Sequence, residues 1–539
     1  MKTCVGVIRW CWPILMLLVG GCQSTPPEEK DPFPPFPEAS ATPSRTQELF
    51  VGTVAQVVKG QAIKIEGYGL VGCLDNTGST TCPANILAYL KRMSQIEVPD
   101  RSVDVETLVR SRSSAVVRIE GTLDPLTCKN DPFDVKVTPL PGSDATSLRG
   151  GWLYNAQLWP VGRSSQAMHK IANAGGAVYV DQLDGGDARL GYVLGGGVVL
   201  KSRTLGLRLQ QPDYNTCAAA RNVINRRFGP GTAMAQDNQN IRLQIPPAYQ
   251  RQRERFLQVL AQIPLNLQMD YFRQRGAFLV QQLSAGQDRT SIELALEAMG
   301  SSGQAHLLPL LQSRDPLLRL VAARALANLG APQGLDQLHQ LAANPLNPES
   351  LRVAAIKAWG AAGNPSIAQQ VLRPLWQDAS LDVALTAYEQ AVELGPQQVD
   401  RVLAGSYIQV DALDGAPHAA IVAHRSQSPR LVLVGGPLAC ELGKTVVSPD
   451  QTLWLDTRSE SGWVQVARRM PGKSDLGPVR CPNNLKVLIQ VLCADSHNTL
   501  DRPNGLGLSY ADLLGFLKFL CEQGVIKAEF WGGPLPESI

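Results

Sequence analysis

The sequence lacks a large charge of either sign. Its 50 basic residues nearly balance 47 acidic residues, which leaves a formal net charge of +3. A protein that binds nucleic acid mainly through phosphate contacts needs a basic field, so this class is disfavoured. Charged residues make up 18% of the chain and hydrophobic residues 44%, which argues against wholesale disorder. A length of 539 residues favours two to four domains.

The sequence also lacks the usual arrangements of catalytic and metal-binding residues. No G-x-S-x-G nucleophile elbow is present. Cys481, Cys493 and His497 have no paired C-x₂-C spacing, so a disulfide is favoured over zinc there. Gly195-Gly196-Gly197 is followed by a strand-like run, whereas a phosphate cradle needs a helix. We therefore expect no enzymatic activity, no cofactor, no catalytic residues and no metal site.

The amino-terminal sequence is typical of an export signal. Lys2 and Arg9 precede an apolar stretch that ends at Gly20-Gly21-Cys22. The sequence before Cys22 resembles the lipobox of bacterial lipoproteins, which implies cleavage after residue 21 and lipid attachment at Cys22. A plain secretory signal with a chance cysteine is the alternative. By the same resemblance, Gln23 favours the outer membrane, and no later segment looks transmembrane.

Residues 22–45 read as a tether, because seven prolines between Thr25 and Ser44 favour an extended, polyproline-like chain. Eight cysteines remain in the exported chain, an even number that suggests disulfides in an oxidising compartment. Local pairing of Cys73 with Cys82 and of Cys481 with Cys493 is expected, although the spacing alone does not fix the connectivity.

The body divides into three parts. Residues 46–282 show alternating strand patterns, as in Phe133–Thr138, with helices between them, and indicate an α+β domain. Residues 283–399 are rich in leucine and alanine and repeat with closing glycines at 300, 330, 360 and 395. Asp315-Pro316 and Asn347-Pro348 predict helix starts with an N-cap followed by proline. Stacked helix pairs that resemble HEAT repeats are favoured over an ordinary bundle. Mixed charges on these repeats give no basic surface for nucleic acid.

Residues 400–539 return to strands and end with a helix and a last strand. Ala419–Ala423 and Leu431–Val434 flank the hairpin-like connection Arg425–Pro429. Leu508–Asp512 opens a helix that runs to Cys521. The expected fold class is therefore α+β in two sequence segments, interrupted by an all-α insert.

Four stretches resemble bacterial flagellar P-ring proteins. They run from Gly67 to Ser79, from Phe133 to Gly151, from Ala220 to Gly229 with Ile241–Pro246, and from Leu508 to Leu514 with Gly524–Glu529. The resemblance skips the helical repeats and implies a P-ring-like scaffold at residues 46–282 and 400–539 with a HEAT-like domain inserted between its parts. The signature positions that carry it are Gly67, Tyr68, Gly69, Leu70, Thr77, Gly78, Asp144, Ser147, Leu148, Arg149, Gly150 and Gly151. Arg149 on its tight turn suits an intersubunit carboxylate or a buried carbonyl, or alternatively an ordinary internal ion pair.

The resemblance implies a structural role in the flagellar basal body. It implies a homo-oligomeric ring in the periplasm around the flagellar rod, next to the L-ring and touching peptidoglycan. A lipid-anchored envelope protein that reuses this fold as a binding module, without a flagellar role, is the alternative. No nucleic-acid partner is implied by either interpretation.

Overall fold

The structure is a computed structural model that describes residues 49–97, 104–161, 170–458, 462–470, 474–495 and 505–536. The export signal, Cys22 and the proline-rich tether lie outside these residues. In the part of the chain that is described, helices and strands are both abundant, and the predicted α+β class is confirmed. No helix within it has the length and apolar character needed to cross a membrane.

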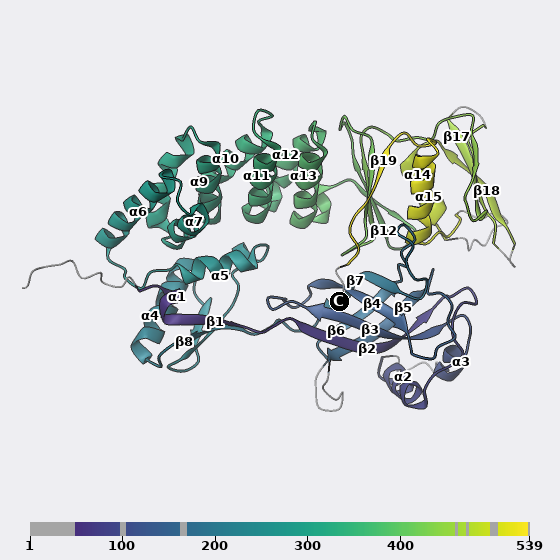
Figure 1. Cartoon of the computed structure of the whole chain (residues 1–539), viewed down its shortest axis with the longest axis horizontal. Coiled ribbons are helices and arrows are strands. Elements are labelled where there is room, and N and C mark those ends of the chain that lie inside the picture. Colours follow the sequence, from purple (N-terminus) through teal and green to yellow (C-terminus); the bar gives the residue numbers. More distant parts are fainter. Residues whose placement is uncertain are drawn as a thin grey trace, which may run out of the picture. The chain divides into compact units, whose positions relative to one another are not determined.

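The first part of the chain is built around a closed antiparallel barrel (Figure 1). Its strands follow one another in the order β2 (Ile63–Gly72), β3 (Ala115–Leu123), β4 (Pro132–Pro139), β7 (Gly191–Val199), β6 (Ala172–Ala177) and β5 (Trp152–Pro160). Ile119, Val135 and Val137 fill the interior because alternate residues of a strand point to the same face. Helices α2 (Ala84–Glu97) and α3 (Val105–Val109) pack against residues of the opposite face, among them Leu70 and Val116.

A second, smaller sheet combines one strand that precedes the barrel in the sequence with three strands that follow it. It has the order β1 (Ala55–Lys59), β8 (Leu205–Leu209), β10 (Asn240–Leu243) and β9 (Ala233–Ala235). Its apolar face forms one core with α1 (Val51–Val54), α4 (Tyr214–Phe228) and α5 (Arg253–Ala261). Asp213 caps α4 by accepting a hydrogen bond from the backbone amide of Thr216.

The leucine- and alanine-rich part forms a series of packed helices, drawn in teal and green in Figure 1. They are α6 (Met269–Ser284), α7 (Arg289–Ala298), α8 (Ser301–Leu307), α9 (Pro316–Asn328), α10 (Pro332–Ala343), α11 (Glu349–Ala362), α12 (Pro365–Leu372) and α13 (Leu381–Leu394). Gly300 and Gly330 adopt positive φ beside helix ends, and Asp315 caps α9 with Pro316 at its first position, as predicted.

Two details of the repeat prediction are wrong. Gly360 does not end a helix but lies inside α11, where its missing side chain leaves room for Gln390 of α13. Asn347 does not cap α11, because Pro348 occupies the cap position. The Asn347 side chain instead donates to the carbonyl of Leu341 and closes the preceding turn.

The last part contains two sheets and two helices. One sheet has the order β11 (Arg401–Ala404), β12 (Ile408–Leu413), β14 (Arg430–Val434), β13 (Ala420–His424) and β19 (Glu529–Gly532). The other has the order β15 (Thr445–Val447), β16 (Leu453–Asp456), β17 (Trp463–Arg468) and β18 (Leu476–Pro482). Helices α14 (Leu485–Cys493) and α15 (Tyr510–Glu522) share a core with residues of both sheets.

The first of these sheets is buried on both faces. Leu431 and Leu433 of β14 join the core of α14 and α15, whereas Val432 and Val434 join the core of the helical repeats. Tyr388 of α13 is fully buried and donates to the carboxylate of Asp411 on β12. The inserted helices are therefore packed against this sheet at their α13 end and are not a freely hanging loop.

The expected disulfides are not formed. All eight cysteines in the described residues are free thiols: Cys73, Cys82, Cys128, Cys217, Cys440, Cys481, Cys493 and Cys521. Cys481 and Cys493 are both buried in the core of the last part, and burial raises the pKa of the Cys481 thiol to about 11. A thiol with a raised pKa has little reactive thiolate at neutral pH, which disfavours its oxidation.

Candidate functional site

The two signature stretches of the first part meet in space. Leu148 is fully buried in the barrel core. The hydroxyl of Thr77 donates to the carbonyl of Ser147 at 2.9 Å, and the amide of Thr146 donates to the carbonyl of Thr77 at 2.9 Å. Asp144 accepts from the hydroxyl of Ser79 at 2.5 Å. The stretches are some 70 residues apart in sequence, so these bonds hold two loops at one end of the barrel together.

The remaining signature residues shape this end of the barrel. Gly67, Tyr68, Gly69 and Leu70 lie on β2, and Gly150 and Gly151 form the turn that leads into β5. Gly78 lies so close to the chain near α3 that a Cβ atom there would stand 2.0 Å from the carbonyl oxygen of Ser114. Only glycine fits this approach without moving the backbone.

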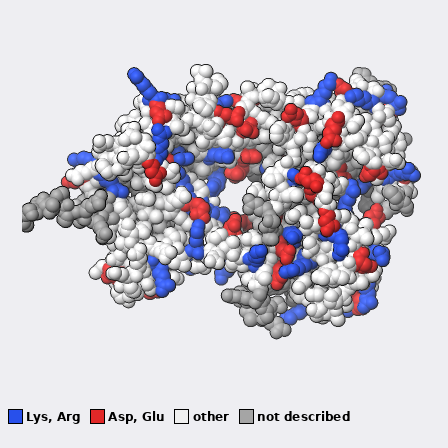
Figure 2. Space-filling view, viewed as in Figure 1, with Lys and Arg blue, Asp and Glu red and all other residues white. Residues whose placement is uncertain are grey.

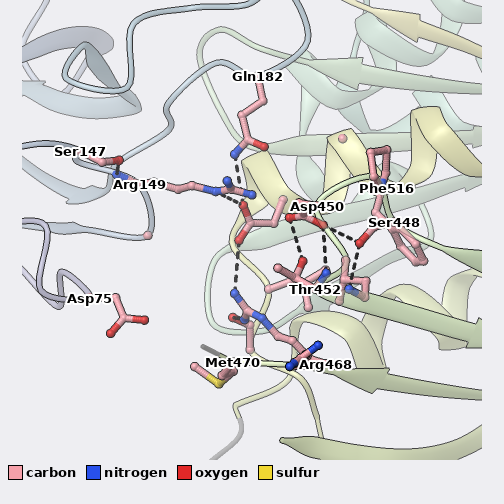
Figure 3. Close-up of a pocket in the computed structure, with 18 of the residues that line it drawn as sticks. Asp75, Ser147, Arg149, Gln182, Ser448, Asp450, Thr452, Arg468, Met470 and Phe516 are labelled. Atoms are coloured by element: carbon pink, nitrogen blue, oxygen red, sulfur yellow. Dashed lines mark hydrogen bonds and ion pairs between the residues drawn. The ribbon is translucent and has the colours of Figure 1, made fainter. Parts of the chain in front are cut away.

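Arg149 reaches from these loops to the last part of the chain. Its Nε donates to Asp512 Oδ1 at 2.5 Å, across 363 residues of sequence. Gln182 donates to the same carboxylate oxygen at 3.1 Å, and Arg468 approaches Oδ2 at 3.5 Å (Figure 3). Of the roles that the sequence allowed for Arg149, the structure therefore forms the internal ion pair.

Asp512 is held in place by the start of α15. Ser509 caps this helix by accepting a hydrogen bond from the amide of Asp512 at 3.3 Å. A carboxylate in the first turn is stabilised by the helix dipole and by the amides that lack helical partners. The Asp512 side chain is 10% exposed, so most of its contacts are with the protein and not with solvent.

A cavity of about 690 Å³ opens beside this ion pair. Figure 3 shows its polar residues, which come from the signature loops and from the last part of the chain. Its apolar lining includes Phe516 and Phe519 of α15. Among the described residues, no group of three side chains that could hold a metal ion is found, here or elsewhere.

A second polar contact joins the same two parts of the chain. Arg425, from the connection between β13 and β14, donates to Asp181 at 3.0 Å and to Asp184 at 2.6 Å. Tyr179 donates to Asp181 at 2.6 Å. Burial would raise the pKa of Asp181, but the hydrogen bonds from Tyr179 and Arg425 outweigh it and lower this pKa. The carboxylate therefore stays charged while almost fully buried.

The hairpin connection that contains Arg425 also docks on the barrel. The amide of Gln427 lies 2.9 Å from both carboxylate oxygens of Asp134 on β4, and the amide of Gly195 donates to Asp134 Oδ1 at 2.6 Å. Tyr179 and Leu194 of the first part belong to the apolar core of the last part. Apolar, ionic and backbone contacts thus unite segments that the repeats separate in sequence.

Sequence reasoning missed most of this junction. The stretch with Asp512 was recognised, but nothing in its pattern names Arg149 as the partner. Arg425 lies in a connection predicted from its flanking strands, and a lone arginine in a polar loop is normally exposed. Its burial follows from the docking of the loop, which only the tertiary structure reveals.

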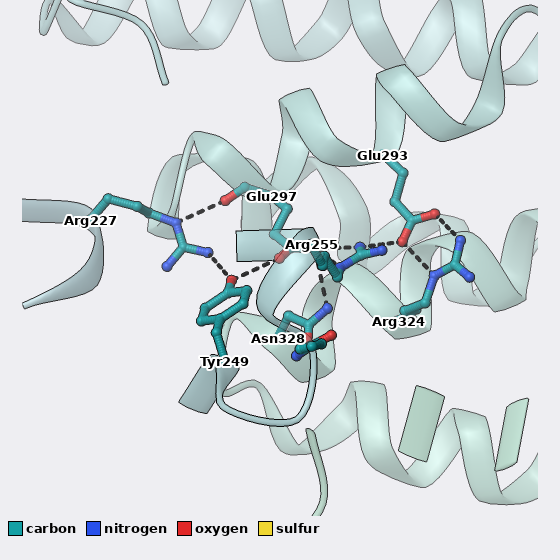
Figure 4. Close-up of polar contacts among 8 residues, drawn as sticks. Arg227, Tyr249, Arg255, Glu293, Glu297, Arg324 and Asn328 are labelled. Atoms are coloured by element: carbon teal, nitrogen blue, oxygen red, sulfur yellow. Dashed lines mark hydrogen bonds and ion pairs between the residues drawn. The ribbon is translucent and has the colours of Figure 1, made fainter. Parts of the chain in front are cut away.

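The helical repeats are joined to the preceding part by a buried ionic network (Figure 4). Arg255 of α5 lies 2.5 Å from both Glu293 and Glu297 of α7, whose carboxylates are 0% exposed. Arg324 of α9 also pairs with Glu293, and Tyr249 donates to Glu297 at 2.7 Å. The expectation that these charges are part of a mixed surface is therefore wrong for the two glutamates.

Comparisons with known proteins agree with the geometry of the first part. Residues 51–271 match the flagellar P-ring protein family. Residues 304–393 match HEAT repeats, which confirms the predicted repeat domain.

Curated relatives cover the same part of the chain. A flagellar P-ring protein of Methylobacillus flagellatus is 29% identical over 220 residues, which are 38% of this chain and 58% of that protein. One from Nitrosospira multiformis is 30% identical over 214 residues, 37% of this chain and 55% of that protein. One from Hydrogenovibrio crunogenus is 29% identical over 240 residues, 41% of this chain and 62% of that protein. The chain thus spans less than two thirds of the relatives it matches.

Proposed function

We propose that this protein is a P-ring-like structural subunit of the bacterial flagellar basal body, which forms a periplasmic ring that acts as a bushing around the rod. The observation that carries the proposal is the match of residues 51–271 to flagellar P-ring proteins. The same match favours this role over an envelope lipoprotein that only reuses the fold. The role is structural and not enzymatic, and it requires no cofactor.

The junction between the first and last parts supports this role mechanically. A closed ring of identical subunits needs two different complementary patches held at a fixed angle within each subunit. The contacts of Arg149, Arg425 and Asp134 across the junction give such a fixed relation between residues distant in sequence. We propose that residues 400–539 complete the P-ring-like scaffold that begins at residue 46.

In Figure 2, the described residues of the visible face form no continuous basic field of the kind that nucleic acid binding needs. Figure 2 shows that basic and acidic side chains are mixed over most of the visible face. We propose that the ring contacts the rod and L-ring proteins and peptidoglycan. The helical repeats at residues 283–399 would add a surface for a further basal-body or envelope protein.

The proposal includes an anchor at the amino terminus. Lipid on Cys22 would hold the protein to the outer membrane, with residues 22–45 as the tether. Mass spectrometry of the purified protein tests this point: a diacylated or triacylated Cys22 at the mature amino terminus supports it. An unmodified amino terminus elsewhere would contradict the anchor but not the ring.

A deletion strain tests the function itself. We expect cells without the protein to lose swimming, and their isolated basal bodies to lack the ring at the periplasmic position. Complementation with the full-length gene should restore both. A deletion strain that swims normally and builds intact basal bodies would contradict the proposed role.

A further inference from the structure

The cavity beside Arg149 is lined by three arginines, Arg149, Arg468 and Arg469, and by the carboxylates of Asp75, Asp450 and Asp512. The Asp512 carboxylate already accepts hydrogen bonds from Arg149 and Gln182 and forms an ion pair with Arg468. Asp450 accepts from the hydroxyl of Ser448 at 2.5 Å and from the hydroxyl of Thr452 at 2.8 Å. The carboxylates that these bonds engage are therefore already satisfied by the protein.

The guanidinium groups of the cavity are less engaged. Arg149 uses only its Nε toward Asp512, and its side chain is 44% exposed. Arg469 also lines the cavity, is exposed, and its side chain has no hydrogen-bond or ionic partner among the described residues. Free guanidinium N–H groups favour a ligand that carries carboxylates.

The cavity also offers an apolar surface next to these donors. Phe516 and Phe519 lie one turn apart on α15, and Leu453 and Met470 line the same cavity from β16 and the end of β17. Aromatic-lined grooves bind proline-rich segments, because such segments are already extended and lose little entropy when they bind. The lining thus favours an acidic peptide with proline or aromatic side chains.

This chain contains a segment of that composition. Residues 26–38 read PPEEKDPFPPFPE, with four carboxylates against one lysine, two phenylalanines and six prolines. The segment precedes the first described residue, Leu49. We propose that the cavity binds residues 26–38 of a second copy of this protein, with carboxylates on Arg149 and Arg469 and a proline or phenylalanine ring against Phe519. The choice of a second copy rests on the proposed ring of identical subunits.

A binding titration tests the cavity. Residues 49–539 form one compact unit with their own cores, so this fragment is a suitable receptor. A fluorescent peptide of residues 26–38 should bind it saturably. Arg469→Gln should weaken binding at least about fivefold, which corresponds to about 1 kcal/mol. Arg458→Gln, which removes an exposed arginine outside the cavity, should leave the affinity unchanged.

Peptide variants separate specific binding from simple charge attraction. Replacing Phe33 and Phe36 by alanine and, separately, the four acidic residues by amides should each weaken binding. Absence of saturable binding would overturn the proposal. An Arg469→Gln variant that binds the peptide as tightly as the wild-type fragment would also overturn it. The same holds if the amide peptide loses binding while the peptide without phenylalanines binds normally.

Sedimentation of a chain that starts at Gln23 tests the second copy. We expect self-association that rises with concentration, is absent in the fragment from Leu49, and is weakened by Arg469→Gln. The chain could instead stay monomeric at all concentrations and no longer bind added peptide. That result would mean that residues 26–38 occupy the cavity of their own molecule, and it would overturn the proposed binding to a second copy. If basal bodies contain the ring but the peptide does not bind the cavity, only this inference is overturned. If the peptide binds but basal bodies contain no ring of this protein, the proposed function is overturned.

Discussion

Gly195 shows how a single residue permits the junction between the first and last parts. Its φ is +61°, and a Cβ atom there would stand 1.9 Å from the carbonyl oxygen of Gln427. The backbone amide of Gly195 donates a hydrogen bond to the Asp134 carboxylate, which also accepts one from the backbone amide of Gln427. A side chain at this position would therefore push the docked hairpin connection away from the barrel.

Gly195→Ala should destabilise the protein by about 3 kcal/mol or more, because strain at positive φ adds to a backbone clash. Gly142→Ala is the matched control, since φ there is +79° but the space around a Cβ atom is open. Urea unfolding of both variants measures the difference. Equal losses of unfolding free energy would show that the approach of Gln427 does not matter.

His424, at the end of β13, gives the stability of the protein a pH dependence. Burial, followed by the nearby Arg430 guanidinium, lowers the pKa of His424 from 6.5 to about 4, while Asp411 opposes the shift. The folded state therefore binds a proton less readily than the unfolded state. The stability that this residue contributes is complete above pH 6.5 and is lost as the pH falls toward 4.

His424→Gln removes this titration. Between pH 6.5 and 4 the wild-type protein should lose unfolding free energy faster than the variant, by about 1.4 kcal/mol per pH unit at most. Urea unfolding of both proteins across this range gives the comparison, in which the many shared carboxylates cancel. Parallel pH profiles would contradict the assignment.

At the scale of elements, the buried network around Glu293 and Glu297 fixes the first repeat helices to α5. Two carboxylates with no exposed surface depend on Arg255 and Arg324 for their charge balance. Burial by itself would lower the pKa of Arg255, but the two glutamates raise it above its ordinary value. The network therefore acts as one unit.

Arg255→Met should cost about 3 to 5 kcal/mol of stability, because it leaves the buried Glu297 carboxylate without a partner of opposite charge, while Glu293 keeps Arg324. Arg273→Ala is the control, since its pair with Asp270 is exposed and should contribute below about 1 kcal/mol. Hydrogen exchange should place the loss in α5 and α7. If both substitutions lower the unfolding free energy by the same small amount, the ionic network does not hold α5 and α7 together.

Periodicity explains which elements the sequence predicts. In strands such as β4 and β8, more buried and less buried residues alternate, so the alternation of apolar and polar residues in the sequence predicts these strands. α14 was not predicted, because its run from Val487 to Leu492 is nearly all apolar and shows no clear amphipathic period. Barrel closure was also missed, since it depends on the pairing of β2 with β5 across the chain.

The candidate site was predictable only in part. The motifs around Gly78 and Arg149 are visible as sequence, and each is local. The partner of Gly78 is Ser114, 36 residues away, and the partner of Arg149 is Asp512, 363 residues away. The contact with Asp512 arises only when the barrel loops and α15 pack together. Local patterns carry no information about such pairings.

At the scale of the whole molecule, the described chain is tied together at four places. The signature loops pair with α15, the Arg425 loop docks on the barrel, and the repeats share cores or ionic networks with the parts before and after them. An insert connected at both ends in this way transmits force instead of swinging freely. That property suits a subunit of a ring that surrounds a rotating rod.

Electron cryo-microscopy of basal bodies isolated from cells that express the tagged protein tests this account most directly. We predict a closed periplasmic ring around the rod whose repeating unit fits the barrel, the last two sheets and the helical repeats. The label should appear in every unit of that ring. A complete ring in that position without the label, and with density that leaves no room for the repeats, would contradict the account.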